Sequence, residues 1–105
     1  IIKVKPPTAA LYQDAAKKVY EKEKIDISSM AARIRHVMQS SFNGRRIVVF
    51  SGGEAKDEAG LFAEIKGLYE GGANGSIIGR NTFQRPRDKA LELLDKIIQI
   101  YQGKA

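Results

Sequence analysis

Residues 47–53 are IVVFSGG, and this stretch decides the fold. Its first four residues form an apolar run, which predicts a strand covered on both faces, and Ser51, Gly52 and Gly53 end that strand. A helical pattern follows over residues 57–70, stopped by Gly71 and Gly72, and its predicted inward face comprises Leu61, Ile65, Leu68 and Tyr69. Residues 76–78 predict the next strand, so the three segments form a βαβ unit, which is parallel and right-handed.

Upstream of this unit, residues 1–5 (IIKVK) predict a strand that Pro6 and Pro7 end. Two helices are expected next, one over residues 9–23 with Thr8 as its N-cap and one over residues 28–41 with Ser28 or Asp26 as its N-cap. The first has an apolar stripe of Tyr12, Ala15, Ala16 and Val19. The second has an apolar face of Met30, Ile34, Val37, Met38 and Phe42, followed by Asn43 and Gly44 as a left-handed stop.

Downstream, residues 81–85 predict a short helical turn, and Pro86 opens a last helix over residues 86–102. Its predicted core stripe comprises Leu91, Leu94, Ile97, Ile98 and Tyr101. The fold class is therefore α/β, with three parallel strands and crossover helices in one domain over residues 1–105. Three strands cannot close a barrel and leave open edges. The expected uncovered inner face comprises Ile1, Ile47, Val49 and Ile78.

Composition narrows the classes of function. The 105 residues contain no cysteine and a single histidine, His36, which excludes a disulfide scaffold and a cysteine nucleophile. A histidine metal site or a Ser-His-Asp triad is disfavoured for the same reason. No apolar run approaches the length of a membrane span, and residues 1–7 are too short for a secretory signal. We expect a cytoplasmic protein without a metal or cofactor.

The charge balance indicates a phosphorylated small molecule as the ligand. Eighteen Lys and Arg against twelve Asp and Glu give a net charge of +6, which suits nucleic acid, an acidic membrane or a phosphorylated metabolite. The basic residues are dispersed, however: KKVYEKEK (17–24) alternates in sign, and no Lys or Arg run exceeds two residues. This pattern disfavours nucleic acid and membranes as partners.

Small and basic residues follow two neighbouring strands. Ser51, Gly52 and Gly53 end the first, and Gly79 and Arg80 follow the second. Glycine lets backbone N–H groups approach an anion, and an arginine fork matches phosphate oxygens. In eight-stranded barrels the phosphate site is frequently formed by the last two strand-end loops and a short extra helix. The glycines alone are also typical of plain turns, and Arg80 of a surface ion pair. The two motifs together favour phosphate.

Two lysines share one face of the opening strand. Lys3 and Lys5 alternate with Ile2 and Val4, and buried lysines are costly. One interpretation is structural: Lys5 reaches water at the strand end, and Lys3 pairs with a carboxylate. The other is a Schiff-base amine, which must be unprotonated to attack a carbonyl. Desolvation and a neighbouring cation both lower the pKa of an amine. Chemistry alone leaves both interpretations open.

IIKVK, VVFSGGEAK and GGANGSIIGRNTFQRP, in this order and followed by an amphipathic helix, resemble the archaeal-type class I fructose-1,6-bisphosphate aldolases. The resemblance covers the whole chain and implies a (β/α)8 TIM barrel, of which the chain would form strands six to eight with their helices. It implies reversible cleavage of fructose 1,6-bisphosphate to dihydroxyacetone phosphate and glyceraldehyde 3-phosphate, without a metal. The resemblance implies these site residues: Lys3 as the Schiff-base nucleophile, Lys5 as its auxiliary neighbour, and Ser51, Gly52, Gly53, Gly79 and Arg80 as substrate-phosphate contacts.

The resemblance is incomplete in two respects. The family's proton-transfer aspartate and tyrosine, on earlier strands, have no counterpart here. Two helices stand between the first two strands where the simplest relatives have one, and a larger bacterial branch has an insertion there. Tyr12, Asp14, Tyr20 and His36 lie in or near that stretch and are assigned no catalytic role; we expect His36 on a surface or helix face.

The chain opens at Ile1 inside a predicted strand, so we expect a fragment, a processed chain or one piece of a nicked protein. The remainder of the barrel would come from an upstream segment or a second chain, within a homo-oligomer, and the fragment alone would be inactive. Two alternatives remain: a related phosphosugar aldolase or transaldolase-like synthase on the same barrel, and a non-catalytic phosphate-binding α/β fragment or flavodoxin-like domain.

Overall fold

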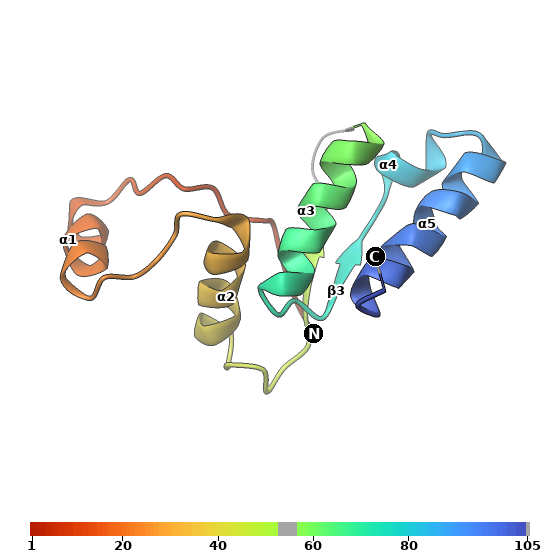
Figure 1. Ribbon diagram of the computed structural model, residues 1–105. Helices are drawn as coiled ribbons and strands as arrows, with labels where there is room; N and C mark the ends of the chain where they lie inside the picture. The colour runs from red at the N-terminus through yellow and green to blue at the C-terminus, as the bar shows by residue number, and fades with distance from the viewer. Residues whose placement is uncertain (53–56, 105) are drawn as a thin grey trace.

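The computed structural model describes residues 1–52 and 57–104. Within these residues, three strands form one parallel sheet in the order β1–β2–β3: β1 is Ile2–Val4, β2 is Val48–Ser51 and β3 is Gly75–Ile77. The helices of this part of the chain are α1 (Asp14–Lys22), α2 (Met30–Ser40), α3 (Glu58–Glu70), α4 (Arg80–Phe83) and α5 (Arg87–Tyr101) (Figure 1). The predicted α/β order is confirmed.

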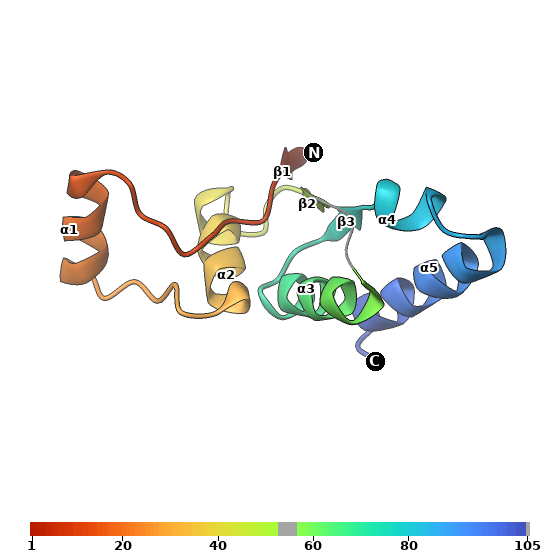
Figure 2. The same cartoon turned by 90° about the horizontal axis from the view of Figure 1, so that it is seen from above.

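Helices α3 and α5 lie on one side of the sheet. We call the sheet together with α2, α3 and α5 the body of the molecule. Figure 2 shows α3 and α5 together beneath the strands, and α2 packs against α3. Right-handed crossovers that step in the same direction across a sheet place their helices on one face. Val48 and Phe50 therefore have no exposed surface, whereas Ile47 is 53% exposed. The prediction that residues 47–50 are covered on both faces is wrong for this chain.

The opposite side of the sheet, which we call the open face, carries Ile1, Lys3, Ile47, Val49 and Ile77. The strand register defines it, because Lys3 pairs with Val49 and Val49 with Gly75. Three of the four residues predicted for this face are confirmed. Ile78 is the exception: it packs against the core, and Ile77 is 45% exposed instead. Strand β3 starts at Gly75, one residue earlier than predicted. Because side chains alternate between the two faces of a sheet, Ile77 lies on the open face and Ile78 on the core side.

The core lies between the sheet and the helices. Its largest fully buried side chains are Phe50, Ile34, Leu61, Ile65, Leu93 and Val48. The predicted inward face of α3 is confirmed for Leu61, Ile65 and Leu68, but Tyr69 is 41% exposed. Gly72 follows α3 with φ +95, the left-handed conformation expected of a helix stop.

The start of α2 is capped one residue later than predicted. The Ser29 hydroxyl accepts a hydrogen bond from the Ala32 amide at 3.1 Å. The Asp26 carboxylate instead accepts from the amide and hydroxyl of Ser28 at 2.9 and 2.7 Å, forming a turn before the helix. After α2, the left-handed stop begins at Phe42 with φ 69 and continues through Asn43 and Gly44. Because the chain turns there, Phe42 leaves the helix face and is 61% exposed rather than buried.

The first predicted helix is shorter than expected. It begins at Asp14 instead of residue 9, and Gln13, not Thr8, is its N-cap. None of its residues is buried, and Tyr12, part of the predicted stripe, is 88% exposed. A helix that buries no residue has few of the tertiary contacts that supply most helix stability.

The predicted stripe of α5 is rotated from the observed one. Leu93, Ile97 and Ile100 are buried, whereas Leu91, Leu94 and Ile98 are 54%, 36% and 54% exposed. Apolar residues occupy two sides of this helix, and periodicity alone does not choose between them. The exposed side borders a cavity of about 490 Å³ beside β3, lined by Leu94, Ile98, Ser76 and Ile78 among others.

Candidate functional site

The carboxyl ends of β2 and β3 meet at one cavity. Ser51 pairs with Ile77 in the sheet, and the Gly52 amide continues the ladder by donating to the Ile77 carbonyl at 3.0 Å. A cavity of about 250 Å³ opens there, lined by Ser51, Gly52, Ile77, Gly79, Arg80, Asn81 and Phe83. Four of the five predicted phosphate contacts thus line the same space. The fifth, Gly53, lies outside the described residues.

Gly52 and Gly79 leave empty the positions that a Cβ would occupy at the cavity. The Gly52 N–H is already bonded to Ile77 and does not reach an anion, so the role left to this glycine is steric. A Cβ at Gly52 would stand 3.6 Å from the Ile77 carbonyl oxygen and 3.9 Å from Asn81 Nδ2, inside the space between the loops. A Cβ at Gly79 would stand 3.4 Å from the Phe83 ring.

Arg80 is the cationic residue of the cavity. It is exposed and is the first residue of α4. It forms no ion pair with any carboxylate in residues 1–52 and 57–104. The surface ion pair considered as an alternative for Arg80 is therefore not observed there. A guanidinium in this position can donate hydrogen bonds to two phosphate oxygens in a fork.

Lys3 and Lys5 lie on the same face as the cavity's Ser51. Lys3 stands beside Val49, and continuing the register by two residues brings Lys5 beside Ser51. The Ser51 hydroxyl makes a long contact, 3.5 Å, with the Val4 carbonyl oxygen. Both lysines are exposed, because the open face carries no covering layer within the described residues. Neither forms an ion pair with a described carboxylate.

Asn81 is a residue of this site that sequence reasoning did not assign. It is 4% exposed and is the buried polar residue of the described part of the chain. The sequence signal was its place in GRN, directly after the arginine, at the start of a turn. The sequence predicts it only as the beginning of that turn.

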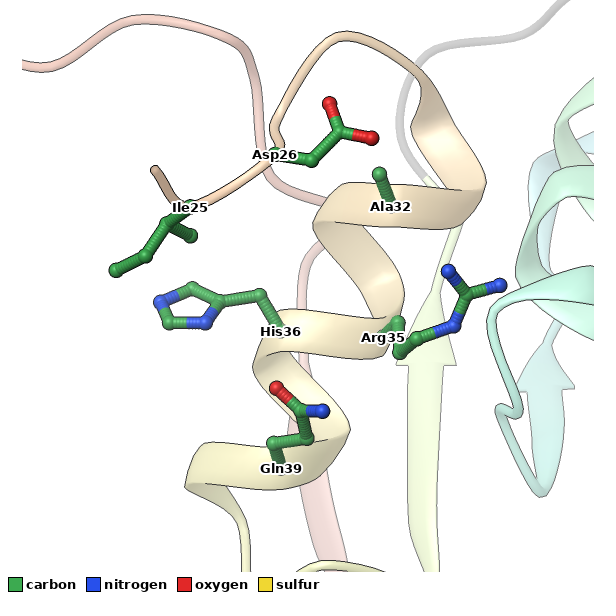
Figure 3. A pocket seen from close by; sticks show the side chains of 6 residues that line it. All are labelled: Ile25, Asp26, Ala32, Arg35, His36 and Gln39. Atoms are coloured by element: carbon green, nitrogen blue, oxygen red, sulfur yellow. The ribbon is translucent and has the colours of Figure 1, made fainter. Parts of the chain in front are cut away.

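A second cavity lies away from the strand ends, on the outer side of α2. It has a volume of about 320 Å³ and is lined by Ile25, Asp26, Ala32, Arg35, His36 and Gln39. Figure 3 shows His36 pointing toward Ile25 and Arg35 pointing away to the other side of the helix. The His36 ring is also engaged by Tyr20, whose hydroxyl lies 2.8 Å from Nε2. This cavity offers no convergent charges, and His36 is a partly buried helix-face residue, close to expectation.

The described residues contain no group of three or more histidine, cysteine or acidic side chains placed to hold a metal ion. No helix in residues 1–52 and 57–104 is both long enough and apolar enough to cross a bilayer.

The sheet and its cavity define a class of fold: parallel strands wound in one direction, helices on the outer face, and a polar cavity at the carboxyl edge. By structure, the chain is similar to the crystal structure of an archaeal fructose 1,6-bisphosphate aldolase, with a TM-score of 0.52 and 20% identity. The match covers 96% of this chain and 44% of that aldolase, so the chain spans less than half of its length. At this identity the likeness shows an aldolase-type fold alone. No protein-family model and no curated protein matches the sequence.

Proposed function

We propose that this chain is part of a class I fructose-bisphosphate aldolase, contributing strands six to eight of its (β/α)8 barrel as a single structural unit over residues 1–105. The observation that carries the proposal is a juxtaposition at one sheet edge. The lysine-bearing strand β1 lies beside β2, and the end of β2 shares a cavity with Gly79 and Arg80. Schiff-base cleavage of a sugar phosphate needs an amine and, close to it, a place for the phosphate, and neighbouring strands carry both here.

Lys3 is the proposed nucleophile. Its amine adds to the C2 ketone of fructose 1,6-bisphosphate, and loss of water gives an iminium ion. Breaking the C3–C4 bond sends its electron pair to the iminium nitrogen and releases glyceraldehyde 3-phosphate. Protonation of the resulting enamine and hydrolysis then release dihydroxyacetone phosphate. Proton transfer to and from substrate oxygens falls to residues on the other strands of the barrel.

Lys5 is the proposed auxiliary cation. The register places it one step nearer the strand ends than Lys3, beside Ser51. A positive charge there disfavours a second ammonium nearby. The desolvation that keeps an amine nucleophilic must come from the strands that cover the open face, because both lysines are exposed in this chain.

Ser51, Gly79 and Arg80 are the proposed contacts of a substrate phosphate; Gly52 lines the same space without a free N–H, and Gly53 follows it in sequence. A phosphate bound at this edge holds the ketone carbon at a fixed position relative to the lysines, so the substrate is oriented for attack. Arg80→Ala in the native assembly, meaning the chain with whatever supplies the remaining strands, should raise KM about ten- to a hundredfold, the value of a charge-assisted hydrogen bond. An unchanged KM would contradict the assignment.

The proposed partners are the remaining barrel strands, within a homo-oligomer in the cytoplasm. The exposed apolar side of α5 carries Leu91, Leu94 and Ile98, and the last two line a cavity beside the unpaired edge of β3. A further parallel strand and its helix would cover both at once. The open face would then become the barrel interior.

A non-catalytic phosphate-binding module is the second candidate, because the exposure of Lys3 is what that function predicts. A related phosphosugar aldolase on the same barrel shares the imine chemistry and differs in its substrate.

Borohydride trapping distinguishes catalysis from binding. With dihydroxyacetone phosphate, the native assembly should gain covalent mass on the peptide containing Lys3. Lys3→Arg should abolish trapping, since a guanidinium keeps the charge but forms no imine, and Lys5→Arg should still be trapped with reduced turnover. Absence of any adduct would leave phosphate binding without catalysis. An adduct on Lys5 alone would reassign the nucleophile and keep the aldolase class.

A further inference from the structure

Arg85 connects the two loops that border the candidate phosphate cavity. Its Nε donates to the backbone carbonyl of Asn81 at 2.7 Å, within the segment that follows β3. Its Nη1 lies 3.9 Å from Glu58 Oε1, on the first residue of α3. One guanidinium therefore contacts α4 and the start of the helix that follows β2. Arg85 does not itself line the cavity.

Asn81 lies between the same two loops. Its side chain is 4% exposed and lines the cavity. Its Nδ2 stands 3.9 Å from the position that a Cβ on Gly52 would take, so the amide faces the end of β2 across the space that Gly52 leaves. Asn81 thus approaches the beginning of the β2–α3 connection, and Arg85, through Glu58, contacts its far end.

We propose that Arg85 and Asn81 are positioning residues of the phosphate site. They hold α4, and with it Gly79 and Arg80, at a fixed distance from Gly52. This inference rests on the proposed function, because it assumes that the cavity takes a phosphate. A planar guanidinium fork suits the role, since it donates to the Asn81 carbonyl while a second nitrogen faces the Glu58 carboxylate, which a lysine ammonium on a flexible stem does poorly. Binding groups need support of this kind to keep a productive geometry.

Two explanations of an Arg85 effect have opposite signatures. If Arg85 acted only by its charge, Arg85→Lys would keep phosphate affinity, and Glu58→Gln, which removes a negative charge near the site, would raise it. If Arg85 positions α4, both substitutions weaken the network and both lower the affinity. The sign of the Glu58→Gln effect therefore decides between them.

The test is isothermal titration of the native assembly with inorganic phosphate. Arg85→Lys and Glu58→Gln should each raise the Kd about two- to thirtyfold, the range seen when residues outside a site alter its coupling. Asn81→Asp, which keeps the shape and adds a negative charge, should also raise it. Arg87→Gln is the matched control: it removes an exposed arginine two residues from Arg85 that does not line the cavity, and it should leave the Kd nearly unchanged.

Thermal unfolding of each variant separates positioning from a loss of folding, because an ion pair this exposed should barely shift the midpoint. Unchanged or tighter binding in Glu58→Gln, or full affinity in Arg85→Lys, would overturn the inference. So would a wild-type assembly that binds no phosphate. Failure of borohydride trapping with phosphate binding intact would instead remove the aldolase proposal and leave the positioning roles standing.

Discussion

The two connections between neighbouring strands differ in how much of their helical surface is buried. Between β2 and β3, α3 buries Leu61, Ile65 and Leu68. Between β1 and β2, α1 buries no residue and stands apart from the body in Figure 1. The chain is accordingly 49 Å long but only 26 and 23 Å in its other dimensions. An amphipathic pattern thus predicts a helix, and its burial depends on a partner that the pattern does not specify.

The largest difference between the two regions should appear on truncating side chains. Phe50→Ala should lower the free energy of unfolding by about 3–5 kcal/mol, because the ring is wholly buried in the core. Val19→Ala on α1 should change it by less than about 0.5 kcal/mol, since that side chain is 51% exposed. Urea denaturation of both variants checks the contrast. A large loss in Val19→Ala would mean that α1 packs against a partner.

Adding a methyl group at the contact between α2 and α3 should also destabilise the fold. A Cβ at Gly71 would lie 2.5 Å from Ile34 Cβ and 2.8 Å from the Ala31 carbonyl oxygen, both fixed parts of α2. Gly71→Ala should therefore cost about 1–3 kcal/mol of unfolding free energy. At Gly67 the nearest atom is Met30 Cγ at 2.8 Å, on a flexible side chain. Gly67→Ala should cost clearly less, and equal losses in the two variants would contradict this packing.

Removing the hydrogen bond between α1 and α2 should have a smaller effect. Tyr20→Phe removes the hydrogen bond between its hydroxyl and His36 Nε2, 2.8 Å apart. Amide hydrogen exchange in α1 should quicken by about two- to tenfold, the value of one hydrogen bond, with exchange in α3 unchanged. Tyr12→Phe is the control, because Tyr12 is 88% exposed. Equal exchange in the two variants would show that the bond does not hold α1.

The smallest effect concerns pH and the turn before α2. The hydrogen bonds from the Ser28 hydroxyl and amide hold the pKa of Asp26 below its usual value of 3.8. A depressed carboxyl pKa stabilises the fold at pH values above 3.8, and that stabilisation is lost as the pH falls from there through the lower, folded pKa. Asp26→Asn should remove the pH dependence in that acidic window and lower stability slightly at the pH values above it, near neutrality included. NMR titration of the Asp26 carboxyl measures the shift directly.

The sequence was most informative where local chemistry and the core agree. The βαβ unit, the Gly72 stop and the buried residues of α3 followed from periodicity and turn residues. It was least informative about which side of a strand or helix is buried, because that depends on which element packs against that side. The exposure of Ile47 reflects that no described element packs over that side of β2, and the buried side of α5 was misassigned because Leu93 and Ile100 compete with Leu91 and Ile98.

The candidate site, too, could be predicted from the sequence only in part. Adjacent strand ends must meet, so the grouping of Ser51, Gly52, Gly79 and Arg80 was predictable from their order. The contacts of Asn81 and Arg85 were not, because they join loops through side chains whose partners lie far apart in sequence. Glu58 and Arg85, for example, are separated by the whole of α3 and β3.

The central claim is that the open face and the β3 edge are completed by further barrel strands. Sedimentation velocity of the purified chain tests this most directly, with denaturant unfolding of the same sample. We predict association, with itself or with a complementary piece, because Ile1 and Ile47 are exposed beside an unpaired strand edge. A compact, cooperatively folding 11.6 kDa monomer would contradict the claim.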